Sequence, residues 1–242
     1  MTFILSIIIS FLNFYPSSFS VPAKPATVSH DAWNDLLKKY VTPDGKVNYQ
    51  GIQHEKSKLE SYLGMLSRNP PQENWQRNEV MAYWINAYNA FTVKLILDYY
   101  PVKSILDIDK GKAWDDVFIK IGDKSYTLDN IENDILRKKF NDPRIHFAIN
   151  CASKSCPKLL NEAYTPDKLD LQLSIVAKNF VNDPSKNKIT ADKIEVSKIF
   201  EWNKNDFTTG ETLIDFLNHY SNKKIQQNAT ISFLDYDWSL NE

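Results

Sequence analysis

The sequence predicts a single α+β domain in which a buried central helix packs against a small mixed or antiparallel sheet. Helical and extended patterns are mixed without the regular strand–helix succession of a parallel α/β fold. Residues 80–97 are apolar on nearly every side of a helix, as expected where neighbouring elements surround it. Apolar residues make up 43% of the chain and aromatic residues 13%, which is enough to form a well-buried core.

The first half of the domain is predicted to be mainly helical. Residues 30–40 and 56–66 place apolar side chains at helical spacing, and a Pro-Asp-Gly turn with a short extended piece separates the two segments. The central helix is expected over about 73–100, where Pro101 ends it. Polar side chains within this helix argue against a membrane span, namely Asn86, Asn89 and Lys94.

The second half is predicted to contain strands and helices in turn. Two short strands are expected at 115–121 and 125–127, and a helix at 128–140. Residues 144–151 alternate between Ile145, Phe147 and Ile149 on one face and His146, Ala148 and Asn150 on the other, which predicts a strand. The later elements are a helix after Thr165-Pro166-Asp167, a hairpin over 188–200, a helix over 213–220 and a strand over 231–236.

The beginning of the chain has the pattern of a secretory signal peptide. Residues 3–14 form an apolar run of about a dozen residues, too short to cross a bilayer as a helix. Small residues precede possible cleavage positions after Ser20 and after Ala23. We predict a signal peptide at 1–23, a linker at 24–28 and a periplasmic or extracellular domain at 29–242 without a stable membrane span. The alternatives are a buried N-terminal element and an uncleaved anchor.

Charge and motifs exclude several classes of function. The formal net charge of −1 lacks the basic excess of a nucleic-acid-binding surface. The sequence contains no Gly-rich phosphate loop, no Gly-x-Ser-x-Gly elbow and no His-Glu-x-x-His helix. We therefore expect no nucleic acid and no cofactor, and a partner that is a small molecule, a peptide or a protein of the cell envelope.

Several strings of residues occur in a fixed order along most of the chain. They are Asp44-Gly45-Lys46-Val47-Asn48-Tyr49, the segment 83–90, the segments 128–132 and 135–137, the run 144–157, the segment 197–207 and the closing run 236–241. In these strings the chain resembles the family known as domain of unknown function 547, over about residues 44–242. The resemblance implies no particular activity, so the candidate residues are argued from their chemistry.

His146 and Glu132 are the first candidates for catalysis. His146 is placed on the less apolar face of its predicted strand, and a side chain that titrates near neutrality suits an acid or a base. A buried histidine with satisfied hydrogen bonds is the alternative. Glu132 has apolar neighbours and needs a cation or donor, which Arg137, Arg144 or His146 would supply. A buried ion pair is favoured over a general base.

Four polar residues are candidates for binding: Asn86, Asn89, Asn150 and Arg144. Asn86 and Asn89 lie three residues apart and so share one face of the central helix. A buried amide without partners costs about 1–3 kcal/mol, so each needs hydrogen bonds. The favoured interpretation is that they bond to the backbone of adjacent loops, and the alternative is that they line a polar cleft.

Cys151 and Cys156 allow three interpretations. The favoured one is a disulfide, which would stabilise the fold by about 2 kcal/mol because it restricts the unfolded chain. The second is a nucleophilic thiol that works with His146, although an extended strand would hold Cys151 about 16 Å from that residue. The third is a redox pair, but the spacing is not Cys-x-x-Cys. Two cysteines without further ligands nearby do not predict a metal site.

The functional prediction is a polar cleft formed by the central helix, the His146 segment and the cysteine loop. A cleft of this kind would serve a binding or accessory module of the cell envelope. The alternative is a thiol-dependent hydrolase or acyl transferase that uses His146 with Cys151 or Cys156.

Overall fold

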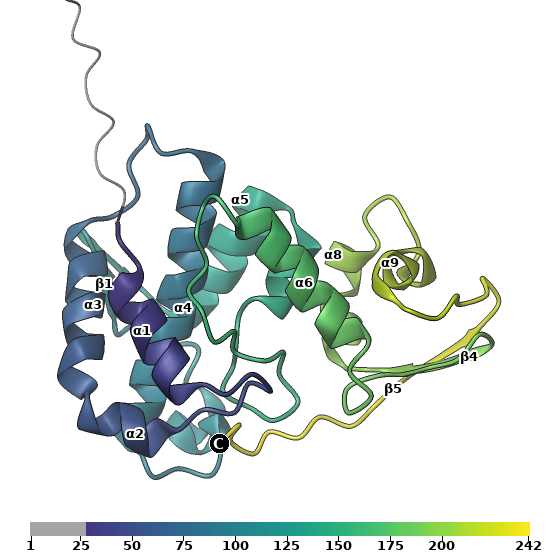
Figure 1. The fold of residues 1–242 in the computed structure, drawn as a ribbon, viewed down its shortest axis with the longest axis horizontal. Helices are drawn as coiled ribbons and strands as arrows, with labels where there is room; N and C mark the ends of the chain where they lie inside the picture. The colour runs from purple at the N-terminus through teal and green to yellow at the C-terminus, as the bar shows by residue number, and fades with distance from the viewer. Residues whose placement is uncertain (1–27) are drawn as a thin grey trace, which may run out of the picture.

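The structure is a computed structural model, and it describes residues 28–242. The predicted signal peptide and nearly all of the predicted linker lie outside the described residues. A helical part at one end of the molecule and a smaller part with most of the strands at the other share one hydrophobic core (Figure 1).

The helical part is built around the long helix α4 (Arg77–Tyr99). It begins at a capping box, in which Gln76 and Glu79 satisfy each other's backbone N–H groups. Between Met81 and Leu97 every residue except Lys94 is buried, as the apolar pattern predicted. The helices of this part are α1 (Asp31–Tyr40), α2 (Tyr49–His54), α3 (Lys56–Arg68) and α4 (Arg77–Tyr99).

The chain then forms a hairpin and an unusual helix. After the 3₁₀ helix η1 (Ile105–Gly111), strands β1 (Ile119–Ile121) and β2 (Lys124–Tyr126) pair antiparallel beside α3. The segment Asn130–Arg137 (η2) is a π-helix that continues into α5 (Lys138–Phe140) and packs against α4. Long π-helical segments are rare, and π-bulges occur frequently at functional sites.

The smaller part combines helices with a mixed sheet. Strand β4 (Lys193–Val196) pairs antiparallel with β3 (Lys188–Ile189) and parallel with β5 (Thr230–Phe233). Five phenylalanine rings from different helical elements pack against one another, with neighbouring centroids 4.9 to 6.5 Å apart: Phe147, Phe180, Phe200, Phe207 and Phe216. The elements are α6 (Leu169–Val181), β3 (Lys188–Ile189), β4 (Lys193–Val196), α7 (Ile199–Trp202), α8 (Lys204–Phe207), α9 (Leu213–Tyr220) and β5 (Thr230–Phe233).

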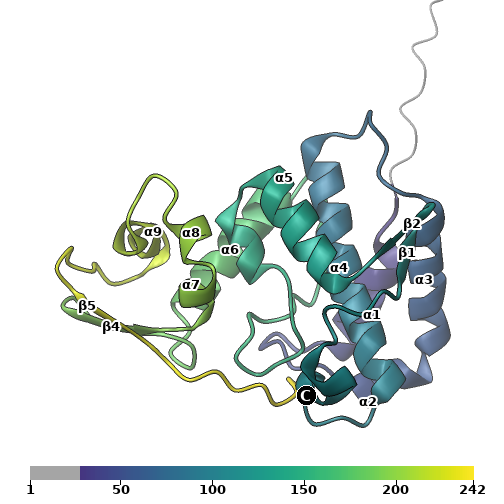
Figure 2. The same cartoon turned by 180° about the vertical axis from the view of Figure 1, so that it is seen from behind.

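The end of the chain connects the two parts. After β5 it runs back across the molecule to the helical part and ends near α2 (Figures 1 and 2). There the backbone N–H of Val47 donates to the carbonyl of Asn241, and the N–H of Leu240 donates to the carbonyl of Lys103. Residues 236–241 are called the closing segment below.

The α+β class is as predicted, but the central helix packs mainly against α2, α3 and η2. Its contact with strands is through β1–β2, where the rings of Trp84 and Tyr126 meet. The mixed sheet lies at the other end of the molecule (Figure 1). Within residues 28–242, no helix is both long enough and apolar enough to cross a membrane.

The predicted strand at 144–151 is wrong. Pro143–Phe147 form the 3₁₀ helix η3, in which Pro143 occupies the first turn and the Asp142 side chain accepts the N–H of Arg144. Ile145, His146 and Phe147 are all buried, because η3 packs between η2 and α6. A short alternating run does not distinguish a strand from a helix that is buried on every side.

Candidate active site

The cysteine loop, residues 150–157, has an unusual backbone at Ala152. Ala152 is fully buried and has a φ of +61°, in the left-handed region that costs a residue with a Cβ about 1–2 kcal/mol. Its N–H donates to Oδ1 of Asn150 at 2.9 Å, and Nδ2 of Asn150 donates to the carbonyl of Pro157 at 2.8 Å. Asn150 therefore closes the loop from the inside, and surrounding contacts maintain a conformation that alanine alone would avoid.

The closing segment holds the same loop from outside. The N–H of Asn241 donates to the carbonyl of Ala152 at 3.1 Å, and the N–H of Lys154 donates to the carbonyl of Ser239 at 2.8 Å. The hydroxyl of Tyr49 donates to Oδ1 of Asn241 at 2.8 Å. Residues more than eighty positions apart in the sequence thus fix the shape of the loop.

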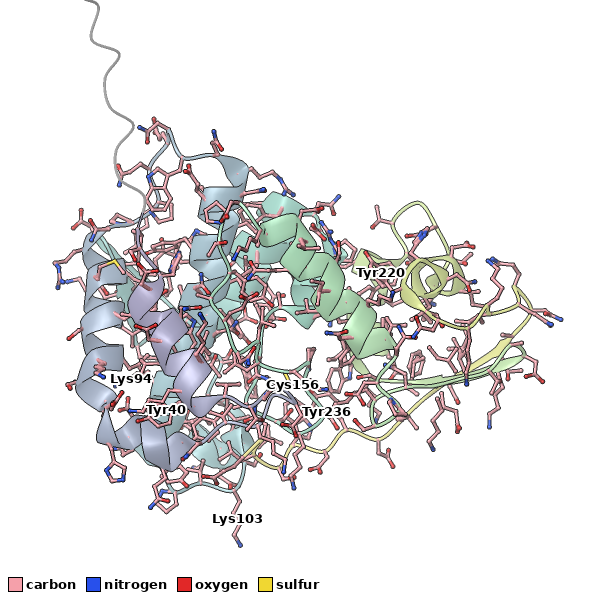
Figure 3. All side chains as sticks on the ribbon, viewed as in Figure 1. Tyr40, Lys94, Lys103, Cys156, Tyr220 and Tyr236 are labelled. Atoms are coloured by element: carbon pink, nitrogen blue, oxygen red, sulfur yellow. The ribbon has the colours of Figure 1, made fainter. Side chains whose placement is uncertain are left out.

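A cavity of about 180 Å³ opens beside this loop. Its walls come from α4, η2, η3, the cysteine loop, α7 and the closing segment, and they include both thiols and His146. Figure 3 shows Cys156 and Tyr236 near each other between the helical part and the sheet. The lining residues are Tyr88, Trp114, Glu132, His146, Ile149, Cys151, Cys156, Pro157, Ile199, Trp202, Asn203, Tyr236 and Trp238.

The two cysteines are separate thiols in this structure. Their Sγ atoms are 2.7 Å apart, whereas a disulfide bond measures about 2.0 Å. The backbone N–H of Cys151 also points to Sγ of Cys156 at 2.8 Å. The predicted disulfide is therefore not present, and it stays a prediction for the oxidised protein.

The two thiols differ in acidity. Burial pushes the pKa of Cys151 up, but hydrogen bonds with Cys156, Ser153 and Tyr236 outweigh it and lower that pKa below the ordinary thiol value. Sγ of Cys151 is 3.2 Å from the Ser153 hydroxyl and 3.3 Å from the Tyr236 hydroxyl. Burial and the neighbouring sulfur raise the pKa of Cys156. Two coupled thiols titrate as a pair, and Cys151 is the one that first becomes a thiolate.

His146 is buried and held by a carboxylate. Its Nε2 lies 2.8 Å from Oδ2 of Asp206, and Nε of Arg137 donates to the same oxygen at 2.7 Å. The hydrogen bonds from His146 and Arg137 keep the pKa of Asp206 well below its usual range, although partial burial opposes them. Asp206 is therefore ionised and accepts the proton on Nε2, which leaves Nδ1 as the ring nitrogen that this bond does not engage.

Glu132 lines the cavity without the ion pair that the sequence predicted. Its Oε2 accepts a hydrogen bond from the Tyr88 hydroxyl at 3.1 Å. Arg137 pairs with Asp206, and Arg144 with Asp142 and Asp170, so no cation in the described part of the chain forms a salt bridge with Glu132. Burial raises the pKa of Glu132 because the charged form loses its hydration.

The amides of Asn86 and Asn89 bond to backbone groups of two loops. Asn86 donates to the carbonyl of Tyr164 at 2.8 Å and accepts its N–H at 3.0 Å. Asn89 donates to the carbonyl of Ala148 at 2.9 Å and accepts the N–H of Asn150 at 2.8 Å. Both have the packing role that the sequence favoured, and neither lines the cavity.

The predicted residues come together only in part. Glu132, His146 and both cysteines share the cavity, whereas Asn150 supports the loop and Arg144 forms ion pairs outside it. Sequence reasoning missed Asp206, which lies sixty positions from His146, and the aromatic residues of the cavity wall. Asp206 belongs to one of the strings in which the chain resembles the family, and nothing else in the sequence pointed to this residue. No cluster of three or more possible metal-ligating side chains occurs within residues 28–242.

Comparison with known proteins identifies a matching family model but no activity. Residues 72–181 match the family model described as "Protein of unknown function, DUF547". No curated protein and no solved structure matches the chain. The matched region contains α4, η2, η3 and the cysteine loop, and so most of the cavity, but Asp206 and the closing segment follow it. The resemblance seen in the sequence is thereby confirmed over residues 72–181, where the chain is similar to the DUF547 family.

Proposed function

We propose that this domain is a thiol-dependent hydrolase or acyl transferase in which Cys151 is the nucleophile and His146 the acid and base. One observation carries the proposal. A thiol whose hydrogen bonds lower its pKa shares a small cavity with a buried histidine, and a carboxylate holds one nitrogen of that histidine. Nucleophile, base and orienting group are the parts that covalent acyl transfer requires.

The fold of the His146 segment supports this pairing. An extended strand would separate Cys151 from His146 by about 16 Å. The 3₁₀ helix η3 advances only about 2 Å per residue, and the turn after it brings both residues to one cavity. The shared cavity therefore supports the pairing of the Cys151 thiol with His146.

The proposed reaction has two steps. The Cys151 thiolate attacks the carbonyl carbon of an acyl donor, and the leaving group departs with a proton from the His146 imidazolium. An acyl-thioester on Cys151 results. Water or an acceptor nucleophile then attacks the thioester while His146 takes up its proton, and the acyl product leaves with restoration of the thiolate. Asp206 acts through His146, because it fixes the tautomer and stabilises the imidazolium.

A binding or accessory module of the cell envelope stays the alternative proposal. The observation that favours it is the aromatic wall of the cavity, since aromatic rings suit ligand binding without chemistry. In such a module Cys151 would be replaceable without loss of ligand binding. Export to the periplasm or beyond belongs to both proposals and rests on the pattern of residues 3–14.

The experiment traps the acyl-thioester on the reduced mature protein. Incubation with an acetyl thioester of N-acetylcysteamine is expected to add one acetyl group, which peptide mass spectrometry locates on Cys151. Cys151→Ala abolishes the adduct. His146→Asn lowers its rate of formation by a factor of about 10² to 10⁴, with thermal unfolding as the check that the variant folds. An adduct that is absent from the wild type, or that survives Cys151→Ala, would overturn the proposal.

A further inference from the structure

The cavity has an aromatic wall at its mouth. The rings of Trp202 and Trp238 are stacked with centroids 5.8 Å apart, and Tyr236 contacts both, at 4.9 and 4.6 Å. Trp114 meets Trp238 edge to face at 5.8 Å. Trp202 remains 50% exposed although it belongs to this cluster. A large ring left half in water beside a cavity offers a surface on which an apolar or planar group can stack.

The volume limits the size of the occupant. An enclosed apolar cavity of about 150 Å³ accepts one benzene molecule. The cavity beside the cysteine loop measures about 180 Å³, so it accommodates a single six-membered ring and a short link to a carbonyl group. A fused two-ring system or a long alkyl chain exceeds this volume and would extend through the mouth of the cavity into solvent.

The charge of the occupant is limited as well. The polar groups at the cavity include Glu132 and the Cys151 thiol, and the Asp206 carboxylate lies behind His146. Each of these groups is neutral or negative, and Arg137 is already engaged by Asp206. His146, the one side chain in the cavity lining that can carry a positive charge, is paired with Asp206 as well. An anionic ligand would therefore have no unpaired cation to bind among the described residues that line the cavity, and its desolvation would be poorly compensated.

We infer that this cavity is an acyl pocket for uncharged acyl groups built on one aromatic ring, such as an arylacetyl group. The identification of the ring-bearing part as the acyl side rests on the proposed function. The binding of the ring itself does not, because it depends only on the aromatic wall, the volume and the charge.

Ligand binding tests the inference without any chemistry. Phenylacetamide, acetamide, 2-naphthylacetamide and phenylacetate are titrated against the reduced Cys151→Ala protein, with calorimetry and tryptophan fluorescence as readouts. Phenylacetamide is expected to bind at least about tenfold more tightly than each of the others, which corresponds to burial of one ring in a fitting site. Equal binding of all four compounds, or tighter binding of the naphthyl compound or of phenylacetate, would overturn the inference.

Two variants and a control locate the binding site. Ile199→Phe fills the cavity and is expected to remove the preference for phenylacetamide. Trp202→Ala removes the half-exposed ring at the mouth of the cavity. It is expected to weaken the binding of phenylacetamide at least about tenfold and to reduce the preference for phenylacetamide over the naphthyl compound. Leu171→Phe, on an exposed site of α6, is the matched control and should change neither. An unchanged preference in folded Trp202→Ala would place the ring elsewhere and contradict the inference.

The same acyl groups, offered as thioesters of N-acetylcysteamine, separate this inference from the proposed function. Faster acylation of Cys151 by the phenylacetyl than by the acetyl thioester supports both. Preferential binding of phenylacetamide without any acylation overturns the proposed function and leaves the aromatic pocket standing. Acylation at equal rates by both thioesters, together with equal binding, overturns the pocket and leaves the proposed function standing.

Discussion

Replacement of Asn89 by leucine should destabilise the protein and loosen the cysteine loop. The side chain of Asn89 satisfies two buried backbone groups, the carbonyl of Ala148 and the N–H of Asn150. Each group left without a partner costs about 1–3 kcal/mol, and the added apolar side chain recovers about 1–2 kcal/mol. We therefore expect the free energy of unfolding to fall by about 3 kcal/mol.

Urea unfolding followed by circular dichroism measures this change, with a shifted midpoint and an unchanged slope. Asn86→Leu is the matched control, because Asn86 makes the same pair of bonds on the same helix but to Tyr164. Both variants should lose similar stability, and only Asn89→Leu should alter the alkylation rate of Cys151 under native conditions. A loss below about 1 kcal/mol for Asn89→Leu, or equal effects of both variants on Cys151, would refute this reasoning.

Three further predictions concern the thiols and the N-terminus. Tyr236→Phe removes a hydrogen bond that lowers the pKa of Cys151, so the rise of its alkylation rate with pH should shift to higher pH; a shift to lower pH would contradict this account. Oxidation with a low-molecular-weight disulfide should join Cys151 to Cys156 and raise the free energy of unfolding by about 2 kcal/mol, while the Cys151→Ser/Cys156→Ser protein should not respond. Stability unchanged by the cross-link would count against a structural role. Mass spectrometry of the protein from its native host should find an N-terminus at or near Val21 or Lys24, and an intact Met1 chain in the cytosol would contradict export.

Much of the fold could be predicted because long helices carry a repeated signal. The periodicity around α3, the all-round apolar pattern of α4 and the segment at α9 each identified a helix to within a few residues. The strand predicted at 144–151 was wrong for a physical reason. Ile145, His146 and Phe147 are consecutive and all buried, so this segment shows no single apolar face and the alternation of its side chains did not reflect a sheet.

The candidate site could be predicted only where its residues lie close together in the chain. Glu132, His146, Cys151 and Cys156 fall within twenty-five positions and were identified from their chemistry. Asp206 reaches His146, and Tyr236 reaches Cys151, only through tertiary structure, because they lie on α8 and on the closing segment. Glu132 does not form the predicted salt bridge with Arg137, because Arg137 forms one with Asp206, which the sequence did not identify.

The choice between Cys151 and Cys156 as the reactive thiol is the centre of the account. Cys151 is the more exposed of the two and has the lowered pKa, whereas Cys156 is buried and has a raised one. A limiting amount of iodoacetamide, added to the reduced native protein at about neutral pH, should modify the more available thiolate first. Peptide mass spectrometry should therefore find Cys151 modified at least about tenfold faster than Cys156. Faster modification of Cys156, or equal rates at both positions, would contradict the account.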